Sequence, residues 1–149
     1  MYKRPDWDEY FLSIAAVVSR RSTCLRRRYG AVIVKDNIII STGYNGAPRG
    51  EEHCTETGKC IRNELNIPKG ERYESCVASH AEMNAIINGD PEKMKGATIY
   101  ITGIEVSNHN YASGAPCLLC KRMIKNAMID TVIYRDKDGS IVRVKAKSL

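Results

Sequence analysis

The chain has no apolar run long enough to span a bilayer among its 149 residues. A membrane-spanning helix needs about 20 consecutive apolar residues. The longest apolar stretch, around residues 31–40, is interrupted by Lys35, Asp36 and Asn37. The first six residues are polar and lead into no apolar core of a signal peptide. These absences predict a soluble, cytoplasmic protein.

The chain also lacks internal repeats and low-complexity segments. Its length suits one domain with a real hydrophobic core, so we expect residues 1–149 to form a single domain. The six cysteines come without a secretion signal. Because cytosolic thiols stay reduced, this cysteine content favours metal binding over disulfides.

Positive charge exceeds negative charge and gives a net charge of +6. Five of the positive charges fall in one short stretch, at Arg20, Arg21, Arg26, Arg27 and Arg28. This cluster has three interpretations: a solvated basic loop, a phosphate site built on fork-shaped arginine pairs, or a nucleic-acid surface. The stripe of interleaved aromatic residues on which single-stranded nucleic acid stacks is missing, which weakens the third interpretation.

Periodicity and turn residues predict an alternation of helices and strands along the chain. The expected helices are Trp7–Ser19 with Asp6 as N-cap, His80–Asn88 with Ser79 as a candidate cap, and Cys117–Met128. The expected strands are Gly30–Val34, Ile38–Tyr44, Ala97–Thr102, Thr131–Tyr134 and Ile141–Val144. A polar stretch from about residue 45 to 75 has no strong period. The order α-β-β-α-β-α-β-β predicts an α/β fold with helices packed on a mixed sheet.

Two short motifs predict a catalytic zinc site. His80-Ala81-Glu82 supplies one imidazole and one nearby carboxylate, and Pro116-Cys117-Leu118-Leu119-Cys120 supplies two thiols. Structural zinc sites usually have four protein ligands, whereas catalytic sites leave one position for water. Three ligands, His80, Cys117 and Cys120, together with the acid Glu82, therefore indicate a reaction as well as a metal. The pattern His-x-Glu…Pro-Cys-x-x-Cys is the known signature of zinc nucleobase deaminases.

With these motifs the chain resembles the deoxycytidylate (dCMP) deaminases of the cytidine deaminase-like superfamily. Arg21-Ser22, Gly30–Val34 and Gly43–Gly50 are similar to segments typical of that family, and Gly43–Gly50 is the most specific of them. The resemblance implies a three-layer α/β/α fold with a mixed sheet of roughly five strands.

The resemblance also implies hydrolysis of dCMP to dUMP and ammonia, which supplies dUMP for dTMP synthesis. Zinc held by His80, Cys117 and Cys120 would activate a water for attack on C4 of cytosine, with Glu82 as base and then acid. The expected substrate-binding residues are the following: Asn45, Ala81, Arg21, Ser22 and Arg26. The last three are expected at the 5′-phosphate.

Four cysteines remain after the catalytic pair: Cys24, Cys54, Cys60 and Cys76. Four thiols match a closed tetrahedral zinc site that would hold the long polar stretch together. The resemblance supports a second, structural zinc, because some family members carry an extra zinc in this region. His53 is an alternative ligand, and four free cysteines are the competing interpretation.

The chain departs from the family between the expected strand end at Thr102 and Pro116. Residues 103–115 form a polar insertion with Gly at both ends, which suits either a loop that reshapes the pocket or a harmless surface insertion. His109 within it is expected to be an exposed loop residue, a further metal role being the alternative.

The resemblance implies partners as well. A homo-oligomer is expected, with a hexamer as one candidate, and dCTP and dTTP are candidate effectors near Gly46–Gly50. An RNA or tRNA base deaminase is the alternative enzyme. The alternative that is not an enzyme is a zinc-dependent nucleic-acid-binding module, and this alternative gives Glu82 no role.

Overall fold

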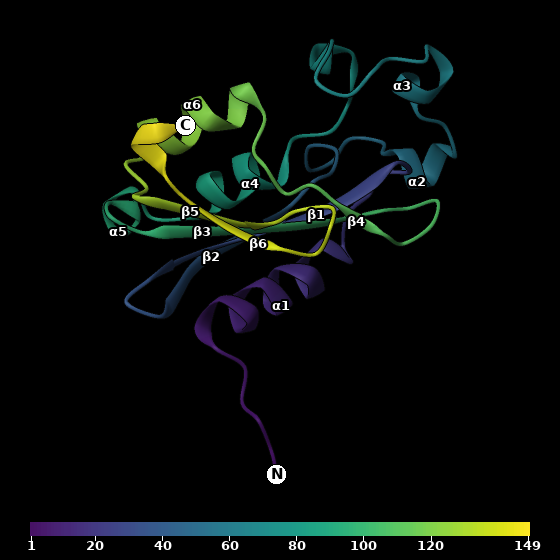
Figure 1. Ribbon diagram of the computed structural model, residues 1–149. Helices are drawn as coiled ribbons and strands as arrows, with labels where there is room; N and C mark the ends of the chain where they lie inside the picture. The colour runs from purple at the N-terminus through teal and green to yellow at the C-terminus, as the bar shows by residue number, and fades with distance from the viewer.

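A six-stranded mixed sheet runs through the structure, a computed structural model that describes residues 1–149 (Figure 1). Its strands are β1 (Arg27–Lys35), β2 (Ile38–Tyr44), β3 (Thr98–Glu105), β4 (Tyr111–Ala112), β5 (Thr131–Arg135) and β6 (Ile141–Lys145). The order is β2-β1-β3-β5-β6, with the short β4 paired to β3. Only β3 and β5 are parallel, and the other pairs are antiparallel. The sheet is therefore mixed, and β4 is an addition to the strands that the sequence predicts.

Helices cover both faces of this sheet (Figure 1). One face carries α1 (Trp7–Ser19), and the other carries α4 (Ala81–Asn88), α5 (Pro91–Met94) and α6 (Leu118–Asn126). The short helices α2 (Cys54–Thr57) and α3 (Ile61–Glu64) and the 3-10 turn η1 (Tyr73–Ser75) lie beyond one end of the sheet, and a second 3-10 turn, η2 (Ala146–Ser148), ends the chain. None of the helices combines the length and apolar character that a membrane span requires. The result is the expected α/β/α layering.

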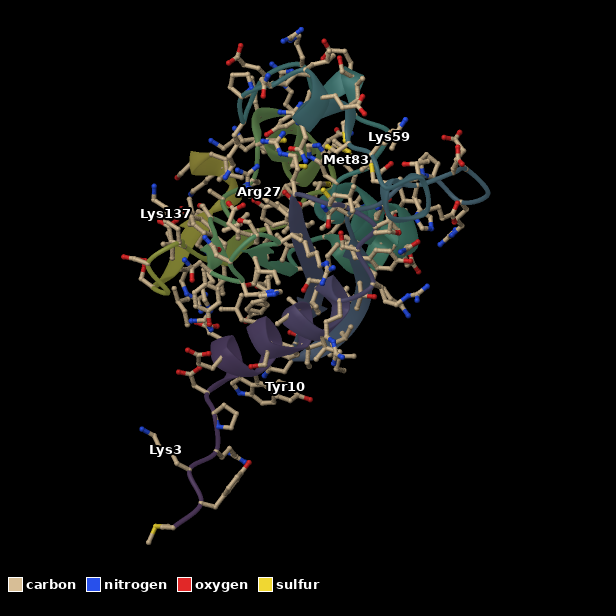
Figure 2. All side chains as sticks on the ribbon, turned by 90° about the vertical axis from the view of Figure 1, so that its right-hand side faces the viewer. Lys3, Tyr10, Arg27, Lys59, Met83 and Lys137 are labelled. Carbon is tan, nitrogen blue, oxygen red and sulfur yellow. The ribbon has the colours of Figure 1, made fainter.

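The first helix begins where its capping residue predicts. The Asp6 carboxylate accepts the Glu9 amide at 2.9 Å, which satisfies a backbone donor at the helix start. Phe11, Leu12 and Ala15 are each at most 1% exposed and pack against the sheet. Residues 1–6 extend away from the body of the molecule, as the position of Lys3 in Figure 2 shows.

The second core lies between the sheet and the helices of the opposite face. It joins strand residues such as Ala31, Ile33 and Ile99 to Ala85 of α4 and Ile124 of α6. All five are fully buried. Because β1 contributes to both cores, its apolar run is nearly continuous instead of alternating, which is typical of a central strand.

Close packing of α4 against β2 depends on Gly43. A Cβ atom there would lie 2.2 Å from the Ala85 nitrogen and 2.5 Å from the Ala81 carbonyl oxygen. Two side-chain bonds fasten the helix at this approach: Ser41 Oγ donates to the Ala85 carbonyl at 2.7 Å, and Asn84 Nδ2 donates to the Tyr44 carbonyl at 2.8 Å. Gly43 thus fixes how closely the start of α4 approaches the sheet.

Several boundaries differ from the predicted ones. β1 begins at Arg27 and not at Gly30, and β3 continues to Glu105 and not to Thr102, because the two strands pair with each other from Arg27↔Glu105 onward. The residue at the N-cap of α4 is His80 instead of Ser79, and its side chain makes no capping bond. Cross-strand pairing, which lies outside local sequence, accounts for the longer strands.

Gly43→Ala is expected to lower the free energy of unfolding by about 2 kcal/mol or more, because the added methyl overpacks the α4–β2 contact. Urea denaturation followed by circular dichroism measures this loss. Gly58→Ala is the control: Gly58 has a φ of +72° with open space around its Cβ position, so only strain of about 1 kcal/mol is expected. Equal losses in the two variants would contradict the packing argument.

Candidate functional site

Two helix N-termini meet on the same face of the sheet. His80 is the N-cap of α4, and Cys117 is the N-cap of α6, where its sulfur accepts the Cys120 amide at 3.5 Å. The free N–H groups and the dipole at a helix start favour negative charge, including that of a thiolate. The fold thereby brings together the three ligands that the sequence places 37 and 40 residues apart.

The three side chains have the spacing of a zinc site. His80 Nδ1 lies 3.4 Å from the Cys117 sulfur and 3.3 Å from the Cys120 sulfur, and all three donor atoms lie within 4.8 Å of one another. Tetrahedral zinc, with bonds of about 2.0–2.3 Å to nitrogen and sulfur, separates its ligand atoms by about 3.6 Å. One imidazole and two thiols thus fit zinc and leave its fourth position for a non-protein ligand.

The thiols form a coupled pair. Hydrogen bonding with Cys120, supported by His80, lowers the pKa of Cys117 to about 4. The same interaction raises the pKa of Cys120, because the two sulfurs share a proton. The lowered pKa favours the thiolate form of Cys117, which is the form that coordinates zinc.

Glu82 lies next to this group without belonging to it. Glu82 is 7% exposed and lies on the first turn of α4. Its carboxyl lines the same cavity as His80 and Cys117. Burial raises the pKa of Glu82, because the charged carboxylate loses its hydration. A carboxyl with a raised pKa can both accept and return a proton, as a general acid–base requires.

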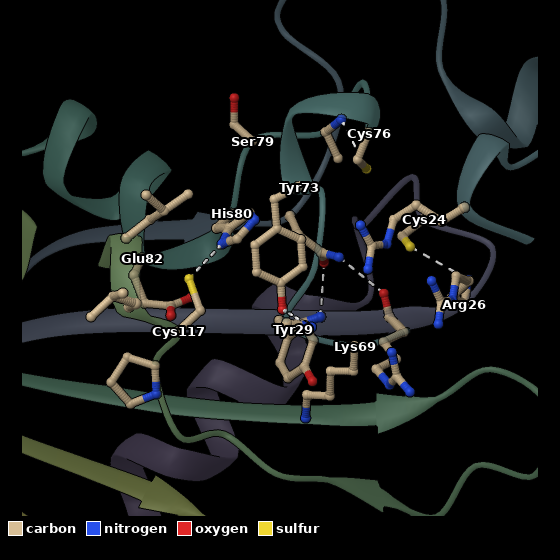
Figure 3. Close-up of a pocket in the computed structure, with 18 of the residues that line it drawn as sticks. Cys24, Arg26, Tyr29, Lys69, Tyr73, Cys76, Ser79, His80, Glu82 and Cys117 are labelled. Carbon is tan, nitrogen blue, oxygen red and sulfur yellow. Dashed lines mark hydrogen bonds between the residues drawn. The ribbon is translucent and has the colours of Figure 1, made fainter. Parts of the chain in front are cut away.

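The cavity has a volume of about 560 Å³ and two different ends (Figure 3). His80, Glu82 and Cys117 lie at one end and Arg26 lies at the other, with Lys69 between them, below Tyr29 in this view. This volume lies within the range of small-molecule sites, about 300–1,000 Å³. The site therefore joins a metal centre with an acid at one end to a cationic region at the other.

The predicted substrate-binding residues occupy different places. Arg26 and Asn45 line the cavity, whereas Ala81 lies buried at the start of α4. Ser22 is buried, and its hydroxyl accepts the Cys24 amide instead of facing the cavity. Arg21 is exposed and is not among the residues that line the cavity. The structure thus brings two of the five side chains to the cavity.

Asn45 holds the backbone of β1 in place. Its Oδ1 accepts the Tyr29 amide at 2.8 Å, and its Nδ2 donates to the Arg27 carbonyl at 2.9 Å. Both ends of the amide group are therefore used to shape the strand that carries Arg27 and Tyr29. The structure gives Asn45 a role in building the cavity wall in addition to its place on that wall.

The cavity wall also contains residues that the sequence did not single out, among them Tyr29, Lys69 and Tyr73, and Arg27 was predicted only as a member of the arginine cluster. Arg27 and Tyr29 share one face of β1, as period-2 alternation predicts once the strand begins at Arg27. Glu105 pairs with Arg27, with an Oε1–Nε distance of 2.7 Å. Lys69 and Tyr73 lie in the irregular stretch, where no periodic signal could identify them.

The four remaining cysteines form no disulfide. Burial raises the pKa of Cys54, and its neighbours Cys60, Cys24 and Cys76 raise it further. The Cys24 and Cys76 sulfurs each accept a backbone amide two residues later, at 3.4 Å. The four residues therefore lie in one neighbourhood, although their sulfurs are not as closely grouped as the donors around His80.

His53 is engaged elsewhere. Its Nδ1 lies 2.6 Å from the Thr55 hydroxyl, and its Nε2 lies 2.6 Å from a Glu56 carboxylate oxygen. With both ring nitrogens occupied, His53 is less available as a metal ligand than the four thiols.

The insertion at residues 103–115 is a hairpin in the structure. β3 continues through Glu105, and β4 returns beside it, with Gly103 opposite Ala112. Only its last residues, Gly114 and Ala115, line the cavity. His109 is exposed at the turn, with a φ of 59°, as expected for a loop residue.

The family of the protein follows from its similarity to known proteins. Residues 5–136 match the model of the cytidine and deoxycytidylate deaminase zinc-binding region. The chain belongs to this deaminase family. Its match to the zinc-binding region and the His80–Cys117–Cys120 group support each other, so the chain is a zinc-dependent deaminase.

Relatives within the family are similar over most of this chain. A deoxycytidylate deaminase of Mycobacterium phage D29 is 41% identical over 88% of this chain and 95% of its own length. One from Schizosaccharomyces pombe is 37% identical over 88% of this chain but only 37% of its own length. The crystal structure of the cyanophage S-TIM5 dCMP deaminase in complex with dCMP and dUMP superimposes with a TM-score of 0.59. It is 26% identical and covers 91% of this chain and 85% of that one.

Proposed function

We propose that residues 1–149 form a single-domain, cytoplasmic deaminase that hydrolyses dCMP to dUMP and ammonia. The observation that carries the proposal is the buried Glu82 carboxyl beside the three-ligand group, facing a cavity whose far end is cationic. The deoxycytidylate deaminases among the relatives, and the dCMP and dUMP bound to the cyanophage enzyme, support the choice of substrate.

Zinc bound to His80, Cys117 and Cys120 would make a water acidic enough to act as a nucleophile near neutral pH. Glu82 removes the proton from the attacking water and delivers it to N3 of cytosine. Attack at C4 gives a tetrahedral carbon that carries both oxygen and the amino group. Glu82 then transfers a second proton from the new hydroxyl to the amino group, so that the C4–N bond breaks and ammonia leaves. One water is consumed, and a carbonyl replaces the amine.

The cationic end of the cavity is the proposed site of the 5′-phosphate. Arg26, which the sequence predicted as a phosphate ligand, lines this end of the cavity, and Arg27 and Lys69 also line the cavity. Arg21, the other predicted arginine, does not line the cavity. Burial lowers the pKa of Lys69, and the charge of Arg27 lowers it further. A phosphate between these two cations would relieve their repulsion, which supports a nucleotide over a nucleoside as substrate.

Glu82→Gln is expected to lower kcat for dCMP by several orders of magnitude while zinc content and fold are retained, since the amide keeps the shape but cannot carry the proton. The measurement is conversion of dCMP, CMP, dCTP, deoxycytidine, cytidine and a cytosine-containing RNA by the wild type and the variant. Preference for dCMP is the expected result. Turnover of the RNA alone, or near wild-type activity of Glu82→Gln, would refute the proposal.

A second, structural zinc at Cys24, Cys54, Cys60 and Cys76 is part of the proposal. Their shared neighbourhood and the amide bonds to the Cys24 and Cys76 sulfurs support it. A metal there would tie α2 and α3 to the loop before β1, and small shifts of these loops would draw the sulfurs to the spacing of zinc ligands.

Metal analysis separates the two sites. The wild type is expected to hold two zinc ions per chain, Cys60→Ser one, and His80→Ala one, with deaminase activity lost only when the catalytic ion is lost. Plasma emission spectrometry of dialysed protein gives the stoichiometry. A single zinc that persists in Cys60→Ser would refute the second site and leave the catalytic one intact.

Homo-oligomerisation and regulation by dCTP and dTTP also belong to the proposal. Residues 46–50 do not line the cavity, but Gly46 and Ser79 exchange backbone hydrogen bonds of 3.1 and 2.8 Å immediately before His80. A ligand on this loop would therefore act on the start of α4 without competing for the cavity.

The expected result is that dCTP shifts the dCMP saturation curve to lower concentration and dTTP shifts it to higher concentration. Initial rates at increasing dCMP, with and without each triphosphate, measure the shifts. Superimposable curves would remove the regulatory part of the proposal and leave the activity untouched.

A further inference from the structure

Residues 68–73 are an irregular segment that forms one wall of the cavity without the support of a long helix or a strand. Lys69, Gly70, Arg72 and Tyr73 from this segment line the cavity (Figure 3). The segment forms no strand pairing. Local turns give some of its carbonyls a backbone donor: Pro68 accepts the Glu71 amide at 3.3 Å, and Arg72 accepts the Ser75 amide at 3.1 Å. Such isolated turn bonds do not fix one conformation of the whole wall.

Arg62 of the preceding helix, α3, adds three side-chain donors to the carbonyls of this segment. Its Nη1 donates to the Glu71 carbonyl at 2.7 Å and to the Arg72 carbonyl at 3.2 Å, and its Nη2 donates to the Pro68 carbonyl at 2.8 Å. Arg62 is only 6% exposed and forms no salt bridge. A buried charge is tolerated when it is well hydrogen-bonded, and here the segment wraps around the guanidinium to provide the acceptors.

The same guanidinium supports the residue that reaches the metal site. Arg62 Cζ lies 4.8 Å from the centre of the Tyr73 ring, in cation–π geometry. The Tyr73 hydroxyl accepts the Gly70 amide at 3.1 Å. The Tyr73 ring meets the His80 imidazole edge-on, with centroids 4.9 Å apart and planes at 90°. Arg62, Tyr73 and His80 thus form a continuous chain of contacts from α3 to the start of α4.

The backbone is strained next to these contacts. Arg72, next to Tyr73, has a φ of 46° and a ψ of 48°, in the left-handed region that is unfavourable for a non-glycine residue. Such conformations persist when surrounding contacts over-determine them. The carbonyl of Arg72 is one of the three that Arg62 binds.

We propose that Arg62 is a positioning residue that keeps residues 68–73 folded as a preformed wall, with Tyr73 seated against His80. This inference rests on the proposed function for the identity of the substrate. In the absence of the guanidinium fork the wall must order when the nucleotide binds, so the ordering cost is expected in KM. The proton transfers at Glu82 do not involve Arg62, so kcat is expected to change little.

The test compares Arg62→Met and Arg62→Lys with Arg122→Met, a matched change at an exposed arginine of α6. Arg62→Met is expected to raise KM for dCMP by about tenfold or more with kcat within about threefold of wild type. Arg62→Lys keeps the charge but not the planar fork, so it is expected to resemble Arg62→Met. Arg122→Met is expected to match the wild type.

A second readout does not depend on turnover. Hydrogen–deuterium exchange of the zinc-loaded, nucleotide-free protein is expected to show faster exchange at residues 68–76 in both Arg62 variants, with α1 and the sheet unchanged. Wild-type KM in Arg62→Met, wild-type behaviour of Arg62→Lys, or unchanged exchange in this segment would each overturn the inference.

Variants of Tyr73 provide a second test of the inference if the Arg62 variants do not fold. Tyr73→Leu removes the ring that links Arg62 to His80, whereas Tyr73→Phe removes only the hydroxyl bond to Gly70. The ring variant is expected to raise KM more than the hydroxyl variant, and the reverse order would overturn the inference. If the wild type does not deaminate dCMP, the proposed function fails, and exchange at residues 68–76 still decides the role of Arg62.

Discussion

The site depends on the convergence of two helix N-termini over one face of the sheet. His80 begins α4 and Cys117 begins α6, so their donor atoms meet only if both helices hold their distance from the strands beneath. Gly43 permits the approach of α4, and the bond from Ser41 to the Ala85 carbonyl secures it. A shift of about 1 Å in either helix would separate ligands that zinc requires at about 3.6 Å from one another. The buried core on this face is therefore what gives the metal site its precision.

The same arrangement explains why the acid is buried next to the metal ligands. Glu82 lies two residues beyond His80, on the first turn of α4, and the packing that fixes the helix also removes the carboxyl from water. Burial of a carboxyl is unfavourable for its charged form, which is why the pKa of Glu82 is raised. A helix start offsets part of this cost through its dipole. Burial is thus the physical source of the raised pKa that the proposed proton transfers of Glu82 require.

The sequence predicts the reactive end of the site better than the binding end, and the reason is the range of the interactions involved. His80 with Glu82, and Cys117 with Cys120, are local pairs whose residue types and spacing already specify a metal and an acid. Arg27 could not be identified in the same way, because its direction depends on where β1 begins, and this depends on pairing with β3. The layered fold was predictable from periodicity, whereas β4 and the ends of the long strands follow from cross-strand contacts.

The irregular wall was beyond prediction for a different reason. Arg62 holds it through three backbone carbonyls, and carbonyls are the same in every residue, so no side-chain pattern in residues 68–73 marks the contact. The site consequently has two kinds of structural support. The helix ends carry the metal ligands and Glu82, and a segment folded around one buried guanidinium forms the wall of the cavity proposed for the nucleotide. Because Tyr73 contacts both Arg62 and His80, the two supports are joined at the point where substrate and metal must be brought together.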